Sequence, residues 1–137
     1  MNYEKYLAQR VKNIEVSTIR YFFTMAKTVE GAISLALGEP DFKTPDYICE
    51  AASRSLDEGK TFYSPTTGLP ELRAEIASYL KCRFDIKYDP ETEIIVTIGA
   101  SQAIDVALRT LVQSGDEVLI PQPSFISYGP CVEMAGG

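Results

Sequence analysis

Three stretches of the chain place apolar residues three or four positions apart, which predicts amphipathic helices. The first has Thr44 as its predicted N-cap and Pro45 at its first helical position, and it ends near Gly59. The second begins at Pro70, with acidic residues early and basic residues late, as the helix dipole prefers. The third ends near Gly115. The three apolar stripes are Ile48, Ala51, Ala52, Ser55 and Leu56; Leu72, Ile76, Leu80 and Phe84; and Ala103, Ile104, Ala107, Leu108, Leu111 and Val112.

Other short runs are apolar without this spacing, which is typical of strands buried on both faces. They are IIVTI at 94–98 and EVLIP at 117–121, and SLALGEPDF at 34–42 begins in a strand-like way. A further short helix is predicted within 123–135, with Pro130 tolerated only near its beginning. This order of elements favours an α/β fold. Two short strands do not make a stable sheet, so the chain is expected to be the front part of something larger.

Composition and charge exclude several classes of function. The chain has 137 residues, 45% of them hydrophobic, which is enough for about one domain. A net charge of −6 argues against nucleic acid or an anionic membrane as the main partner. No apolar run approaches the roughly 20 residues of a membrane span. The first residues lack the apolar core of a signal peptide, so the expected location is cytoplasmic.

The absence of histidine excludes a Ser-His-Asp triad, a Cys-His dyad and the common histidine-containing zinc sites. The three cysteines, Cys49, Cys82 and Cys131, fit neither a disulfide framework nor a CxxC metal site. They are interpreted as buried, inert thiols. Asp105 and Arg109 are expected to form an ion pair on an exposed helix face.

The stretch VTIGASQAID, residues 96–105, runs from an apolar segment through small residues into a predicted helix. The first N–H groups of a helix have no intrahelical partner, and the peptide dipoles place about half a positive charge there. With the Ser101 hydroxyl as an added donor, phosphate is the natural ligand. Neither GxGxxG nor GxxxxGK[ST] is present, which disfavours dinucleotide and Walker-type sites. The turn alone leaves open that Gly99 only ends a strand and Ser101 only caps a helix.

Five segments occur together and in order: LGEPDF (37–42), YSPTTGLPELR (63–73), TIGASQAI (97–104), GDEVLIPQPSF (115–125) and AGG (135–137). In this combination the chain closely resembles the N-terminal portion of the class I/II aminotransferases. These are pyridoxal-phosphate enzymes of fold type I, the aspartate aminotransferase fold. The resemblance implies an α/β fold in which the chain supplies helices plus the first strands of the large-domain sheet.

The resemblance also implies a division into domains. Residues 1–43 would form an N-terminal arm and a small-domain or interface segment. Residues 44–137 would form the start of the large domain that binds pyridoxal phosphate, which would be incomplete.

The resemblance assigns the turn to the phosphate of pyridoxal 5'-phosphate. Ala100, Ser101 and Gln102 occupy the matching positions, so their backbone N–H groups and the Ser101 hydroxyl are expected to contact it. Phe125 matches the aromatic residue that stacks on the pyridine ring. The alternative for Phe125 is an ordinary core phenylalanine.

Two further residues match positions near the substrate and the second subunit. Tyr63 matches the tyrosine whose hydroxyl reaches the phosphate of the other subunit, which implies a homodimer with a shared active site. Gly38 matches the glycine whose backbone lies against the substrate carboxylate. The alternatives are a tyrosine packed on the surface and a plain turn glycine.

The implied reaction moves an amino group between an amino acid and a 2-oxo acid. It needs a lysine that forms a Schiff base with the cofactor, and no lysine of this chain lies at a matching position. No catalytic residue is therefore expected within the chain, which alone should be inactive. The alternatives are a carbon–sulfur lyase or synthase of the same fold, and a non-catalytic phosphate-binding or dimerisation module. The lysines are Lys5, Lys12, Lys27, Lys43, Lys60, Lys81 and Lys87.

Overall fold

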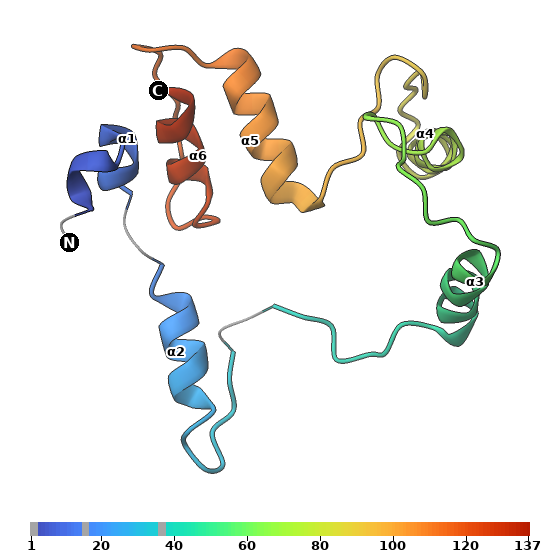
Figure 1. The fold of residues 1–137 in the computed structure, drawn as a ribbon, viewed down its shortest axis with the longest axis horizontal. Coiled ribbons are helices and arrows are strands. Elements are labelled where there is room, and N and C mark those ends of the chain that lie inside the picture. Colours follow the sequence, from blue (N-terminus) through green and yellow to red (C-terminus); the bar gives the residue numbers. More distant parts are fainter. Residues whose placement is uncertain (1–2, 15–16, 36–37) are drawn as a thin grey trace. The chain divides into compact units, whose positions relative to one another are not determined.

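The computed structural model describes residues 3–14, 17–35 and 38–137 (Figure 1). Helices are the only regular elements among these residues. They are the 3-10 helix η1 (Glu4–Tyr6), α1 (Gln9–Lys12), α2 (Ile19–Ala26), α3 (Asp46–Asp57), α4 (Pro70–Phe84), α5 (Gly99–Leu111) and α6 (Tyr128–Ala135). None of these helices is long and apolar enough to cross a membrane.

The helices predicted from the apolar stripes are confirmed, with shifts at their ends. α3 begins at Asp46, so its N-cap is Pro45 and the prediction of Thr44 is wrong by one residue. The positive φ of +72° at Gly59 lies just past the end of this helix, as expected. α4 has Pro70 in its first turn and the left-handed Asp85 as its C-cap.

α5 and α6 also form where helices were predicted. α5 begins at Gly99, within the small-residue turn itself. It ends at Leu111, four residues before Gly115, because Val112 already has extended backbone angles. α6 carries Pro130 as its third residue, where a missing N–H does not interrupt the helix.

The two predicted strands are not present as hydrogen-bonded strands among the described residues. Residues 94–98 and 117–121 follow irregular paths without ladder hydrogen bonds. The run 34–42 includes residues 36 and 37, which lie outside the described residues. A strand exists only through bonds to a neighbouring strand. Several apolar side chains of these runs accordingly remain exposed, with Ile95 64% and Leu119 96% exposed, whereas Ile94 is buried.

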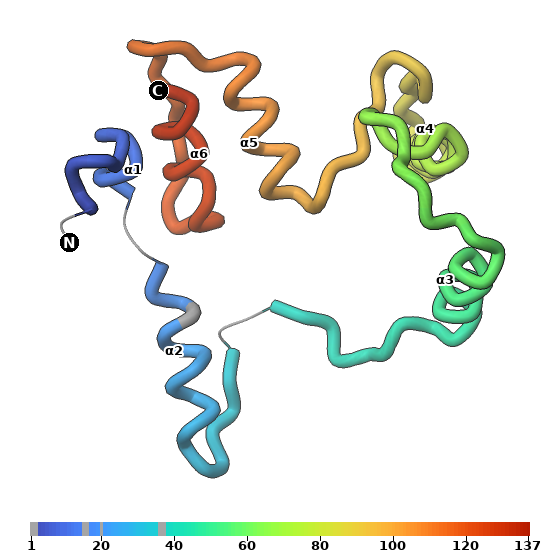
Figure 2. Tube along the Cα trace, viewed as in Figure 1, coloured from blue at the N-terminus to red at the C-terminus, as the bar shows by residue number. Residues whose placement is uncertain are grey.

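The chain divides into two compact units, one of Met1–Thr18 with Ile95–Gly137 and one of Ile19–Ile94. In the first unit α5 packs beside α6, joined by the connection 112–127 (Figure 2). Arg109 Nε donates to both carboxylate oxygens of Asp105, at 3.0 and 2.9 Å, and Arg109 Nη1 donates to the Met134 carbonyl at 3.4 Å. The predicted ion pair therefore forms, with the Arg109 side chain exposed and Asp105 half-buried, and Arg109 also reaches α6.

In the second unit, α4 holds the loop that follows it. Arg73 is 8% exposed, and its Nη1 donates to the Pro90 carbonyl and, at 3.1 Å, to the Glu91 carbonyl. Asp89 accepts hydrogen bonds from the Glu91 N–H and the Thr92 hydroxyl, both at 2.8 Å, and these bonds lower the pKa of its carboxyl. The loop 85–93 is thus fixed by its own carboxylate and by a guanidinium.

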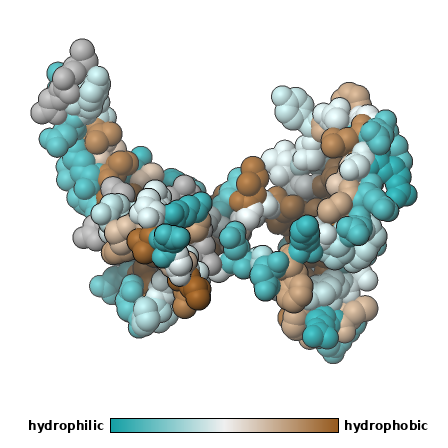
Figure 3. All heavy atoms as spheres, turned by 90° about the horizontal axis from the view of Figure 1, so that it is seen from below, coloured by the Kyte–Doolittle hydropathy of each residue, from teal (hydrophilic) through white to brown (hydrophobic). Residues whose placement is uncertain are grey.

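Very little apolar surface is buried within the chain. Ile94, 9% exposed, is the only buried hydrophobic side chain among the described residues. Apolar side chains lie open on the face seen in Figure 3. The prediction of buried thiols is wrong for Cys49 and Cys82, which are exposed because nothing described covers their helix faces. Cys131 on α6 is half-buried, and its burial raises the pKa of the thiol.

Candidate functional site

The small-residue turn leads directly into α5. Gly99 has a φ of +76°, a left-handed conformation that side chains rarely adopt. Its N–H donates to the Thr97 carbonyl at 2.9 Å, and the Thr97 hydroxyl donates to the Gly99 carbonyl at 3.0 Å. Thr97 and Gly99 therefore hold each other through a reciprocal pair of bonds, which sets the direction in which α5 starts.

The start of α5 presents hydrogen-bond donors that no described group uses. The N–H groups of Ala100 and Ser101, and the Ser101 hydroxyl, make no hydrogen bond within the described part of the chain. Both residues are exposed. Because α5 has 13 residues, its aligned peptide dipoles add positive potential at these donors. An anion with several acceptor oxygens fits this donor set.

Gln102 behaves differently from its two neighbours. Its Oε1 accepts the backbone N–H of Ile98 at 2.6 Å, so this side chain reaches back across the turn. The sequence pointed only to the backbone of Gln102, and this side-chain contact was not predicted. A glutamine in the first turns of a helix, behind an apolar N-cap, is the signal that could have revealed it.

Phe125 lies in the same compact unit as the turn, shortly before α6. Its ring is 47% exposed and meets Tyr128 edge to face, with centroids 5.6 Å apart and an interplanar angle of 79°. Nearly half of the side chain is exposed in this chain, and both interpretations of Phe125 stay predictions. The exposed ring is available for stacking.

Gly38 and Tyr63 belong to the other compact unit. Tyr63 is fully exposed and contacts no other ring in the described chain. A Cβ placed on Gly38 would meet no atom within 4 Å, so the packing of this chain does not itself require glycine there. Each residue is open to a group from outside the chain.

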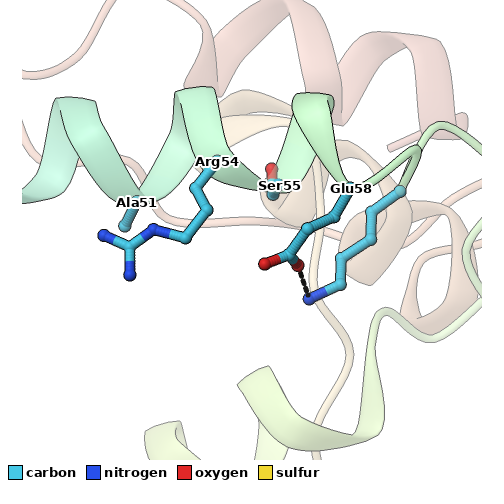
Figure 4. A pocket seen from close by; sticks show the side chains of 5 residues that line it. Ala51, Arg54, Ser55 and Glu58 are labelled. Carbon is cyan, nitrogen blue, oxygen red and sulfur yellow. Dashed lines mark ion pairs between the residues drawn. The ribbon is translucent and has the colours of Figure 1, made fainter.

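A surface pocket near the end of α3 contains none of the predicted site residues. It is lined by Ala51, Arg54, Ser55, Glu58 and Lys60 (Figure 4). The Lys60 ammonium pairs with the Glu58 carboxylate at 2.7 Å, so the two charges largely satisfy each other. No group of residues able to hold a metal ion occurs in the described ranges.

The donors at the start of α5 fit the phosphate of pyridoxal phosphate. Two N–H groups and a hydroxyl without partners among the described residues lie in the first turn of a helix, and such donors suit a phosphate. The residues from Ile95 to Gly137 include no lysine, so they supply the means to hold the phosphate but not a covalent attachment for the ring.

Comparison with known proteins gives consistent matches. Residues 30–137 match the family described as aminotransferase class I and II. The "Probable aspartate aminotransferase" of Methanocaldococcus jannaschii is 51% identical over 131 residues, covering 96% of this chain and 34% of that protein. Aromatic-amino-acid aminotransferase 2 of Thermococcus litoralis is 46% identical over 131 residues, with the same two coverages.

Comparison with solved structures also gives an aminotransferase match. Aspartate aminotransferase from Thermus thermophilus with maleate superposes with a TM-score of 0.86 at 36% identity, covering 96% of this chain and 35% of that one. The chain therefore spans about a third of the length of the relatives that it matches.

Proposed function

Because this chain belongs to the aminotransferase class I and II family, we propose that it forms the N-terminal part of a pyridoxal-phosphate-dependent aminotransferase. The whole enzyme moves an amino group between an amino acid and a 2-oxo acid. One observation carries this proposal. In a chain of this family, the N–H groups of Ala100 and Ser101 at the start of α5 make no hydrogen bond within the described residues.

Each candidate residue has a role in this proposal. The N–H groups of the turn 100–102 and the Ser101 hydroxyl bind the cofactor phosphate, which fixes one end of the cofactor. Phe125 stacks on the pyridine ring and limits its tilt. The cofactor, when bound, supplies the electron sink that the chemistry requires.

Two residues act toward other molecules. Tyr63 donates its hydroxyl to the phosphate bound by a second subunit, so the active enzyme is a homodimer with shared sites. The backbone at Gly38 lies against the substrate carboxylate, where a side chain would intrude. Residues 1–43 serve as arm and interface segment, and residues 44–137 begin the cofactor-binding domain.

The chain by itself holds the phosphate without catalysing transfer, because it contains no lysine at a matching position to move the proton at the substrate Cα. Incubation of the 137-residue chain with pyridoxal phosphate, an amino donor and 2-oxoglutarate should give no transamination. Turnover by the chain alone would overturn this part of the proposal.

A chimaera tests the positive part. This chain replaces the matching 131 residues of the Methanocaldococcus jannaschii relative, which supplies the remainder. The chimaera should bind pyridoxal phosphate and transaminate. Failure to bind pyridoxal phosphate, when the parent relative binds it, would contradict the proposal. Release of a 2-oxo acid together with ammonia, over many turnovers and without any amino acceptor, would instead indicate a lyase of the same fold.

A further inference from the structure

We propose that Gln102 is a positioning residue: its side chain holds the phosphate turn in shape and leaves the donors of Ala100 and Ser101 for the cofactor phosphate. This proposal rests on the proposed function, since it concerns the same turn. It gives the Gln102 side chain a role distinct from direct contact with the phosphate.

A helix start is commonly secured by two reciprocal bonds. The N-cap side chain accepts an N–H of the first turn, and a Glu or Gln side chain in that turn accepts the N-cap N–H. In α5 the first bond is absent, and a bond similar to the second comes from Gln102, four residues after the N-cap instead of the usual three. Gln102 Oε1 accepts the Ile98 N–H at 2.6 Å, whereas Ile98, the N-cap, has no side chain able to accept a bond.

The missing half of this arrangement has a chemical consequence. A serine, threonine or aspartate at position 98 would accept the N–H of Ala100 or Ser101. Because the residue there is isoleucine, which has no side-chain acceptor, both N–H groups make no hydrogen bond among the described residues. The helix start is thus secured through the Ile98 N–H, while the N–H groups of Ala100 and Ser101 stay without a partner among the described residues.

Two further hydrogen bonds lie at the point where the chain enters α5. The reciprocal bonds between Thr97 and Gly99 orient the backbone that enters α5. Gln102 adds a bond to Ile98, which lies between Thr97 and Gly99, so all three residues are held by hydrogen bonds before a ligand arrives. Of α3 to α6, α5 is the only helix in which a side chain from within the helix accepts the N–H of the N-cap residue.

The test uses the chimaera and two cofactor probes. Pyridoxal phosphate and pyridoxal share the ring and aldehyde and differ by the phosphate. In Gln102→Met, which keeps the length of the side chain and removes the acceptor, the Kd for pyridoxal phosphate should rise about fivefold to tenfold while that for pyridoxal stays unchanged. Hydrogen exchange of the Ile98 amide should quicken in the same variant.

Gln102→Glu is the conservative counterpart. Its carboxylate accepts the same N–H, so the Ile98 amide should remain as protected as in the unsubstituted chimaera. Gln113→Met is the matched control, because Gln113 is exposed in the same compact unit and its side chain makes no hydrogen bond in the described chain. It should leave both affinities and the Ile98 amide unchanged.

The outcomes separate the two proposals. If the unsubstituted chimaera does not bind pyridoxal phosphate, the proposed function fails. If it binds, and Gln102→Met leaves the affinity ratio of the two probes and the Ile98 exchange unchanged, the positioning role of Gln102 is wrong. An equal loss of affinity for both probes would also overturn it, since that result indicates general damage to the fold.

Discussion

At the scale of single residues, the apolar side chain of Ile98 affects which hydrogen-bond donors are available at the start of α5. Ile98 is 90% exposed, so burial does not account for an isoleucine there within this chain. Its inability to accept a hydrogen bond leaves the N–H groups of Ala100 and Ser101 open. Gly99, with its positive φ, lets the backbone turn so that these groups face outward.

This reasoning predicts opposite effects of one substitution on stability and on binding. Ile98→Ser in the chimaera adds an N-cap acceptor, which should stabilise the apo protein by about 0.5–1 kcal/mol. The same hydroxyl competes with the phosphate, so the Kd for pyridoxal phosphate should rise about threefold to fivefold. Chemical denaturation of the apo protein and cofactor titration measure the two effects.

Ile95→Ser is the matched control for that experiment. Ile95 is also an exposed isoleucine of the segment before α5, but it does not cap the helix. The Ile95→Ser substitution should not raise the Kd for pyridoxal phosphate relative to the Kd for pyridoxal. An Ile98→Ser variant that binds pyridoxal phosphate as tightly as the unsubstituted chimaera would contradict the argument.

At the scale of elements, α4 and the loop after it form a unit that hydrogen bonds hold together. Within the described part of the chain, Arg73 is a buried charged side chain that forms no ion pair with a carboxylate, and its Nε makes no hydrogen bond. Burying such a group is costly unless its bonds are good. The carbonyls of Pro90 and Glu91 supply those bonds, so the loop and the guanidinium depend on each other.

Arg73→Met in the chimaera should therefore lower the free energy of unfolding by about 1–3 kcal/mol, because two carbonyls lose a charged donor. Urea denaturation measures this change. Arg54→Met on α3 is the control, since Arg54 is exposed and makes no ion pair in the described chain. Equal effects of the two substitutions would show that the buried contacts of Arg73 are unimportant.

At the scale of the whole molecule, the described helices do not enclose a hydrophobic core. Only Ile94 is a buried hydrophobic side chain among the described residues, while aromatic and aliphatic side chains of both compact units stay exposed. Burial of apolar surface is the dominant favourable term in folding. The described conformation therefore needs additional polypeptide around it, as the relatives of about three times the length provide.

The isolated chain should then lack a cooperative thermal unfolding transition and should bind a dye such as ANS, which reports exposed apolar surface. The chimaera should unfold cooperatively and bind little dye. Calorimetry and dye fluorescence make the comparison. A sharp calorimetric transition of the isolated chain, without dye binding, would show that it forms a core of its own.

The sequence by itself determined the family, the positions of α3, α4, α5 and α6, and the turn at 99–102, because helix stripes, caps and short motifs depend on residues close together along the chain. It did not determine whether 94–98 and 117–121 become strands, since a strand depends on a partner that periodicity cannot supply. Only the tertiary structure decided that Arg109 on α5 donates a hydrogen bond to α6 and that Arg73 donates hydrogen bonds to the loop after α4. It also decided that the Gln102 side chain turns back to Ile98, because such contacts depend on the direction of each side chain in space, which residue type and spacing leave open.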